Sequence, residues 1–398
     1  DQYHGNLGEM IVSKLNNNNP SCDAWIQAAN EYGLPHNSDF NGETTYGVGS
    51  YQFSSSGRMR YSSSTAFLKP AIKRGNVTLK INALVSKVLF SGKKAIGVEW
   101  IENNENKKAY SNKEIILSSG SLQSPQILQL SGIGPAELLK KLNIPIVFDS
   151  PEVGKNLQDH YQVRGIVELN DNKGSVNNQS RNPLKIAEWG LRWLLFGSGP
   201  LTCGAGQVGG AACSKYSQNG RPDLQFNVMP LSVDKPGEPL HKYPGFTASV
   251  WQCHPKSRGS LNIKSTDPRE QAEIRPEYLS EKLDKDVIVE GIKMIRDIFN
   301  QPSFKKLWDK EVLPGKEIKT DKEILDWARN NGGTVFHAVG TCRMGDDNKS
   351  VVNEKLQVRG VENLRVIDAS VMPQVTSANT NAPSLMIGEK GASLILDS

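Results

Sequence analysis

Two segments near the C-terminus combine residue types that could carry acid–base chemistry. In the first, Thr334–Gly345, His337 stands in a run of apolar residues that ends at a glycine, a pattern that predicts a strand and a turn. An imidazole titrates near neutral pH and is the side chain most often used to remove a proton from a hydroxyl. A histidine in an apolar segment can equally be a hydrogen-bonded core residue, so the segment alone leaves both roles open.

The second segment, Leu364–Pro383, contains an apolar strand that ends at Asp368-Ala369. A carboxylate or backbone amide at such a strand end could bind a polyol or a pyrophosphate, and it could equally cap a turn. After Asn379-Thr380-Asn381, Pro383 opens a predicted C-terminal helix, whose first N–H groups make a positively polarised end. The residues expected to face inward from this helix are Leu385, Met386, Ala392 and Leu394.

A strand, a turn and a helix earlier in the chain would position such a site. Ile115-Ile116-Leu117 is short and wholly apolar, as in strands buried within parallel sheets. A turn of small residues follows, and we expect a helix with Ser124 as N-cap and Pro125 at its first position, ending at Ser131-Gly132. This order is typical of phosphate and dinucleotide sites, although many other α/β turns share it.

The remaining periodic segments predict two kinds of domain. Alternating strands and helices around the motifs indicate an α/β domain with a parallel sheet. Spaced short strands between about residues 163 and 263 indicate an α+β domain, in which helices cover an antiparallel sheet. Helices are expected over 21–32 with Ser21 as N-cap, 184–196 and 283–299, strands over 77–81, 85–90 and 95–101, and a polar hairpin tip over 102–108.

Composition excludes several function classes. The 398 residues carry a net charge of +5 without a clustered basic run, so nucleic-acid binding has no support. No apolar stretch approaches the ~18 residues of a membrane span. The five cysteines are scattered and never form Cys-x-x-Cys, so we expect neither a metal site nor a disulfide framework. A reducing compartment such as the cytoplasm is the simpler expectation, with membrane association left open.

Several long motifs resemble those of the glucose–methanol–choline (GMC) oxidoreductase family. Gly120–Gly134 (GSLQSPQILQLSGIG) and Val153–His160 (VGKNLQDH) resemble its signatures, and the segments around His337, Asp368 and Asn379 resemble its C-terminal motifs in the same order. Shorter matches at Tyr3-His4-Gly5, Asp39–Gly42 and Pro255–Ser260 extend the resemblance over essentially the whole sequence.

The resemblance implies an FAD-dependent oxidation of an alcohol to an aldehyde or ketone. His337 would be the base for the alcohol proton, Asn379 would bind the substrate oxygen, and the hydride would pass to flavin N5. The residues implied to approach the flavin are Asp368, Ala369, Thr380 and Asn381, and Val85 is implied to contact the adenine. Asp159 and His160 are expected to be structural, since Asn, Asp and His in loops commonly bond to their own loop.

The resemblance also implies a partial Rossmann-like FAD-binding domain. Residues 66–160 and 333–398 would form it, residues 161–332 would form the substrate domain, and residues 1–65 would be a cap segment on the substrate side. A family member should open with a Gly-x-Gly-x-x-Gly turn after a strand. Only Gly204–Gly210 fits that spacing loosely, outside a βαβ unit. We therefore expect a truncated chain whose FAD site needs a separate N-terminal fragment.

Substrate and acceptor are less defined by the sequence. The segment Gly199–Cys213, which the resemblance assigns to the substrate pocket, has no carboxylate or aromatic group to hold a quaternary ammonium. An uncharged small alcohol is therefore expected rather than choline, with oxygen, a quinone or a dye-like acceptor all open. Two alternatives remain, a flavoprotein of the hydroxynitrile-lyase type and a non-catalytic remnant.

Overall fold

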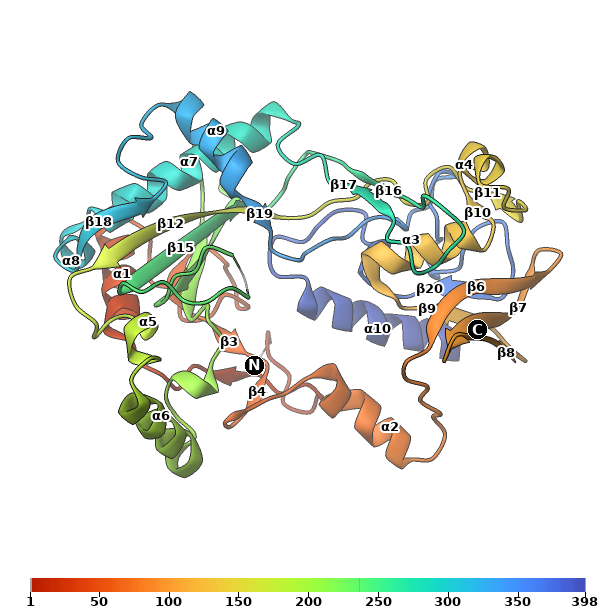
Figure 1. Ribbon diagram of the computed structural model, residues 1–398, viewed down its shortest axis with the longest axis horizontal. Coiled ribbons are helices and arrows are strands. Elements are labelled where there is room, and N and C mark those ends of the chain that lie inside the picture. The colour runs from red at the N-terminus through yellow and green to blue at the C-terminus, as the bar shows by residue number, and fades with distance from the viewer. Residues whose placement is uncertain (1, 236, 398) are drawn as a thin grey trace. The chain divides into compact units, whose positions relative to one another are not determined.

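The computed structural model describes residues 2–235 and 237–397, which form two compact units (Figure 1). Each unit is assembled from three separate stretches of the chain. Unit 1 contains residues up to Thr78, Tyr161–Cys253 and Lys285–Gly333. Unit 2 contains Leu79–His160, His254–Asp284 and the residues from Thr334 onward. The predicted assignment of chain segments to flavin and substrate domains stays a prediction.

Unit 1 is built on an antiparallel sheet. Its strands are ordered β13-β14-β15-β12-β18, and β19 also pairs with β12. Every residue of the central strand β15 is buried, as expected for a strand covered on both faces. The strand bounds are β12 (Tyr161–Leu169), β13 (Val208–Ala212), β14 (Leu224–Met229), β15 (Gly245–Gln252), β18 (Trp308–Leu313) and β19 (Gly333–Thr334).

Helices cover this sheet through close contacts at glycines. On α7 (Lys282–Phe299), a Cβ at Gly291 would lie 2.9 Å from Val250 of β15, so only glycine allows this approach. Helix α9 (Asp321–Asn331) lies beside α7 (Figure 1). Helix α1 (Pro20–Tyr32) packs Trp25 against Phe226 of β14, with ring centroids 6.0 Å apart. Its N-cap is Asn19 rather than the predicted Ser21, because the Asn19 side chain accepts from two first-turn N–H groups.

Unit 2 combines an antiparallel meander with a parallel strand pair. The meander consists of β6 (Leu84–Ser91), β7 (Lys94–Glu102) and β8 (Glu105–Tyr110). The parallel pair is β9 (Ile115–Leu117) and β20 (Leu364–Val366), which confirms both predicted strands. Helices α3 (Gly120–Leu130) and α10 (Asn381–Leu396) follow β9 and β20 along the chain, and one apolar core joins these elements. The mixed α/β and α+β fold is therefore as predicted.

Three local predictions were wrong. Residues 77–81 form no strand, since their apolar side chains are exposed and no partner strand occurs among the described residues. The predicted tip at 102–108 is shorter, because Asn103 and Asn104 turn the chain with φ of 52° and 61° and β8 begins at Glu105. Helix α3 begins at Gly120, so Ser124 and Pro125 lie inside it rather than at its start.

Helix α10 also differs from its prediction. It begins at Asn381, two residues before Pro383, and its buried residues are Ile387 and Gly391 while Met386 is exposed. The inward face of the helix contains Gly391, where a Cβ would lie 2.5 Å from the Ile367 side chain. A close approach of this kind selects a small residue, and a count of apolar residues overlooks it.

The remaining elements are short, apart from α6 (Pro183–Phe196). No helix among the described residues is long and apolar enough to cross a membrane. In unit 1 the others are β1 (Ser13–Lys14), β2 (Gly47–Ser50), β3 (Gln52–Phe53), β4 (Ser55–Ser56), β5 (Met59–Arg60), the π-helical turn η1 (Ser64–Leu68), α2 (Lys69–Lys73), α5 (Val176–Gln179), η2 (Pro200–Thr202) and α8 (Pro302–Lys305). In unit 2 they are β10 (Ile133–Gly134), α4 (Ala136–Lys141), β11 (Phe148–Asp149), β16 (Ser260–Asn262), β17 (Glu273–Arg275) and η3 (Ala369–Val371).

Candidate active site

His337 lies in an irregular segment of unit 2, not in the predicted strand. Its backbone N–H donates to Oδ1 of Asp159 at 2.9 Å. A side-chain oxygen therefore takes the place of the backbone carbonyl that a neighbouring strand would supply. Oδ2 of Asp159 accepts from the Tyr278 hydroxyl at 2.5 Å and from the Thr334 hydroxyl. Burial raises the pKa of Asp159, while these donors act in the opposite direction. Asp159 thus fixes the position of the backbone at His337.

The imidazole of His337 is held at both nitrogens. Nδ1 lies 2.9 Å from Nδ1 of His160, and Nε2 lies 3.1 Å from the amide nitrogen of Asn379. His160 is fully buried and His337 is only 6% exposed, with the two rings edge-on at 84°. Burial lowers the pKa of His337 to about 4. The imidazole is therefore neutral at physiological pH and able to accept a proton.

These contacts define a tautomer. An amide nitrogen can only donate, so Nε2 of His337 is the acceptor from Asn379. A neutral His337 then carries its proton on Nδ1 and donates it to Nδ1 of His160. In this arrangement the lone pair of His337 is on Nε2, next to the Asn379 amide. Sequence reasoning brought His337 and Asn379 together but treated His160 as structural only.

The backbone around His337 is specialised. Phe336 immediately before it has φ of 64°, an uncommon value for a bulky residue, and its side chain is 75% exposed. Gly340 has φ of 91°, and a Cβ there would lie 2.5 Å from the Asn156 carbonyl oxygen. Asn156 in turn donates through its side chain to the carbonyl of Gly340. A fixed loop therefore follows the histidine, as its glycine suggested.

Of the predicted cofactor residues, Asp368 is occupied within the protein. Its carboxylate accepts from the N–H of Gly120 at 3.0 Å, from the Ser124 hydroxyl at 2.5 Å and from the N–H of Ser370 at 2.7 Å. It therefore joins the carboxyl ends of β9 and β20, and it caps the turn η3 that contains half-buried Ala369. Of the two roles left open for Asp368, the structure shows the cap.

The start of α10 keeps donor capacity. Its N-cap residue Thr380 is buried and makes no side-chain cap hydrogen bond, and Asn381 at the first position is exposed. N–H groups and a positive helix end favour an electron-rich ligand edge, so the donor set fits the part of a flavin that gains negative charge on reduction. Val85, the predicted adenine contact, is half-buried in β6 opposite Trp100.

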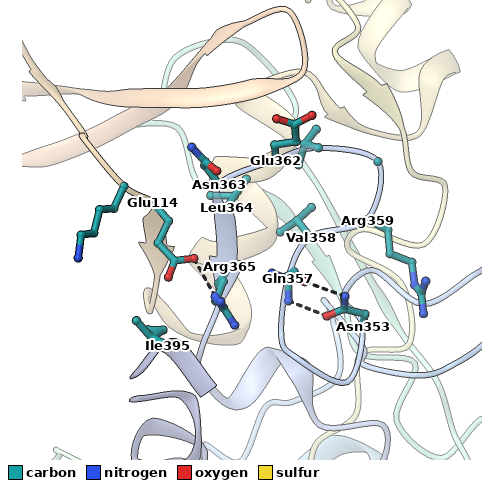
Figure 2. A pocket seen from close by; sticks show the side chains of 13 residues that line it. Glu114, Asn353, Gln357, Val358, Arg359, Glu362, Asn363, Leu364, Arg365 and Ile395 are labelled. Carbon is teal, nitrogen blue, oxygen red and sulfur yellow. Dashed lines mark hydrogen bonds and ion pairs between the residues drawn. The ribbon is translucent and has the colours of Figure 1, made fainter. Parts of the chain in front are cut away.

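A pocket of about 720 Å³ opens elsewhere in unit 2 (Figure 2). Glu114 at the start of β9 pairs with Arg365 of β20 at 2.7 Å inside it, and Asn353 and Gln357 bond to each other beside them. This pocket borders the amino-terminal ends of the parallel strands, whereas ligands of open α/β sheets bind beyond the carboxyl ends. It is therefore separate from the site around His337.

Comparison with known protein families decides the classification. Residues 2–162 match the N-terminal domain and residues 255–388 the C-terminal domain described as GMC oxidoreductase. The chain belongs to the GMC oxidoreductase family. This membership confirms the resemblance seen in the motifs and makes FAD the cofactor.

This GMC oxidoreductase is similar to dehydrogenases along almost its whole length. It is 40% identical to an alcohol dehydrogenase [acceptor] of Pseudomonas putida, over 99% of this chain and 71% of the relative. It is 37% identical to the mitochondrial choline dehydrogenase of Mus musculus, over 99% of this chain and 66% of that protein. An oxygen-dependent choline dehydrogenase of Klebsiella pneumoniae is also 37% identical, with 72% of its length covered. The chain thus spans about two thirds to three quarters of these relatives.

Solved structures show the same fold. An FAD-dependent oxidoreductase from Chaetomium thermophilum superposes with a TM-score of 0.88 at 27% identity, over 98% of this chain and 74% of that one. A formate oxidase superposes with a TM-score of 0.89 at 25% identity, over 98% of this chain and 73% of that one. The expectation of a missing N-terminal FAD-binding fragment stays a prediction, as do the roles of the individual site residues.

Proposed function

We propose that this GMC oxidoreductase oxidises a small uncharged alcohol to an aldehyde or ketone, with His337 as the base and Asn379 as the ligand of the substrate oxygen. The observation that carries the proposal is the buried, neutral His337, whose Nε2 lone pair faces the Asn379 amide at 3.1 Å. A substrate hydroxyl that replaces this hydrogen bond can donate to Nε2 and accept from the amide. Both contacts orient the same oxygen.

Proton transfer follows from this arrangement. As the alcohol proton moves to Nε2, His337 becomes an imidazolium whose Nδ1–H donates to His160. A charge-assisted hydrogen bond is roughly twice as strong as a neutral one, so His160 stabilises the charge when it appears. Asn379 cannot take a proton and remains a donor to the alkoxide oxygen. His337 is therefore the single base of the pair.

FAD, when bound, supplies the acceptor for the hydride that leaves the alcohol carbon. We assign its contacts to the N–H groups at the start of α10 around Asn381, to Thr380 beside them and to Ala369 of η3, with Val85 toward the adenine. The support for this assignment is the uncapped helix start. Asp368 contributes by fixing the turn that presents Ala369, since its carboxylate is already occupied by three donors.

The substrate class rests on composition. Segment 199–213 has no acidic or aromatic residue that could bind a quaternary ammonium. Two of the relatives named above are choline dehydrogenases and one is an alcohol dehydrogenase. Because segment 199–213 lacks such residues, we place this chain with the enzymes that use neutral alcohols.

The test is a comparison of substrates under anaerobic conditions. Purified protein is loaded with FAD, with the predicted N-terminal fragment added if the chain alone does not retain the flavin. It is then mixed with a neutral primary alcohol or with choline, and flavin bleaching is followed. The proposal predicts a larger kcat/KM for flavin reduction with the neutral alcohol. A clear preference for choline would contradict the substrate assignment. Cyanide release from mandelonitrile without bleaching would instead support the alternative lyase function.

A further inference from the structure

Helix α6 in unit 1 presents large apolar side chains to solvent. Leu184 is 80% exposed and Phe196 is 71% exposed, and Leu191, Leu194 and Leu195 are each more than half exposed. The helix lies at the periphery of its unit, away from the strands of the central sheet (Figure 1). Apolar residues of a surface helix normally face the core, so this orientation is inverted.

The orientation of α6 is fixed by its other face. Trp189 is buried, and the Trp193 ring donates to the Arg58 carbonyl at 3.1 Å while the Arg58 guanidinium lies 5.5 Å from the centre of that ring. Asn182 caps the first turn and Gly197, with φ of 57°, ends the last. Because the tryptophans hold one face, the leucines must point outward.

The outward leucines lie in a stripe on one side of the helix. Leu184, Leu191 and Leu195 are separated by seven and four residues, with Leu194 beside them and Glu188 on the same face between Leu184 and Leu191. Met59 at the neighbouring hairpin and Leu201 after the helix are also more than half exposed. Soluble monomers rarely expose contiguous apolar patches above a few hundred Å², and larger patches mark interaction surfaces.

Basic residues accompany this stripe. Segments 54–61 and 181–201 contain five basic residues and one acidic residue, Glu188, which is paired with Lys185 at 2.7 Å. The five are Arg58, Arg60, Arg181, Lys185 and Arg192. An excess of positive charge around an apolar stripe with tryptophan and phenylalanine is the pattern of helices that lie in the surface of an anionic bilayer.

From this surface we propose that α6 docks the protein on an anionic lipid membrane, with the helix axis in the membrane plane. Its 14 residues would span about 21 Å, short of the roughly 30 Å of a hydrocarbon core, so the helix cannot cross. The leucines enter the acyl boundary, while the exposed Arg60 and Arg192 bind lipid phosphates and the other three basic residues, which bond within the protein, add to the positive potential. This inference is independent of the proposed alcohol chemistry.

The test is co-sedimentation of the FAD-loaded chain with vesicles. One set contains phosphatidylcholine alone, and the other contains equal parts of phosphatidylcholine and phosphatidylglycerol. We expect binding to the anionic vesicles, weakened by salt and reduced at least about tenfold by the double substitution Leu191→Glu with Leu195→Glu. Tyr110→Glu, at an exposed aromatic residue of unit 2, is the matched control and should bind like the parent.

Other outcomes would overturn the proposal. Absence of vesicle binding, or binding that the double substitution leaves unchanged, removes α6 from this role. Equal binding to both vesicle types overturns the anionic requirement. A concentration-dependent dimer that the double substitution dissociates, without vesicle binding, would assign the stripe to a second copy of the chain. Thermal unfolding and flavin reduction should match the parent in every variant, because both replaced leucines are exposed.

Discussion

The Nδ1 atoms of His160 and His337 lie 2.9 Å apart, so one of them must carry a proton that the other accepts. The Asn379 amide at Nε2 of His337 selects the arrangement in which His337 donates. If the proton pattern were reversed, a neutral His337 would hold its proton on Nε2 and could not act as a base there. Asn379 and His160 together therefore keep the proton of His337 on Nδ1 and its lone pair on Nε2.

Two substitutions of His160 should distinguish its role as a hydrogen-bond acceptor from its role in packing. His160→Phe removes the acceptor for Nδ1–H of His337, so the imidazolium that forms on proton transfer loses its charge-assisted hydrogen bond and kcat should fall about tenfold or more. His160→Asn offers a carbonyl oxygen near the former Nδ1 and should recover much of that loss. Steady-state kinetics would show the change in kcat with a smaller change in KM. Equal losses in both variants would indicate a packing role only.

The buried His337 should make stability depend on pH. Its pKa falls from 6.5 to about 4 in the folded protein, so the unfolded chain takes up a proton first as the pH drops. The contribution of neutral His337 to the free energy of unfolding is fully present above pH 6.5. It is lost as the pH falls toward 4, by roughly 1.4 kcal/mol per pH unit. Denaturant titrations across this range should show a shallower slope for His337→Asn.

A carboxylate at position 379 should raise the pKa of His337. Asn379→Asp places a negative charge within hydrogen-bond reach of Nε2, which favours the imidazolium form. The acidic limb of the kcat/KM profile should then move to higher pH by about one unit or more. Asn379→Ala should weaken substrate use without that upward shift. An unmoved acidic limb in the Asp variant would argue against His337 as the titrating base.

Gly340 should tolerate no side chain. Gly340→Ala combines a left-handed backbone with a contact of 2.5 Å to the Asn156 carbonyl oxygen, so it should destabilise the fold by about 3 kcal/mol or more. Gly92 also has a positive φ, of 60°, but its Cβ would point into open space, so Gly92→Ala should cost only about 1 to 2 kcal/mol. Urea titration compares the two. Equal losses would mean that the loop after His337 adjusts freely.

Local patterns predicted much of this fold. The short apolar runs of β9 and β20 and the periodic helices α6 and α7 were predicted close to their observed bounds, because burial and periodicity act within a few residues. The start of α3 was predicted wrongly because the Ser124 hydroxyl does not cap the helix. It donates a hydrogen bond to Asp368, which lies 244 residues later in the chain. Propensity contains no information about such a partner.

The active site shows the same difference between local patterns, which the sequence reveals, and long-range contacts, which it does not. His337 and Asn379 were predicted because family motifs surround each of them, and they are joined in the structure by a direct contact. The link between His160 and His337 spans 177 residues and depends on ring orientation, which no sequence spacing encodes. The predicted strand at His337 failed because Asp159 satisfies its backbone N–H from a different segment.

Anaerobic stopped-flow of the FAD-loaded protein can show whether His337 takes the alcohol proton. Parent and His337→Gln proteins are mixed with a neutral primary alcohol, and the visible flavin band is followed. We expect that the variant keeps a normal bound-flavin spectrum and reduces the flavin roughly 10² to 10⁴ times more slowly. Reduction at the parental rate in His337→Gln would contradict this role of His337.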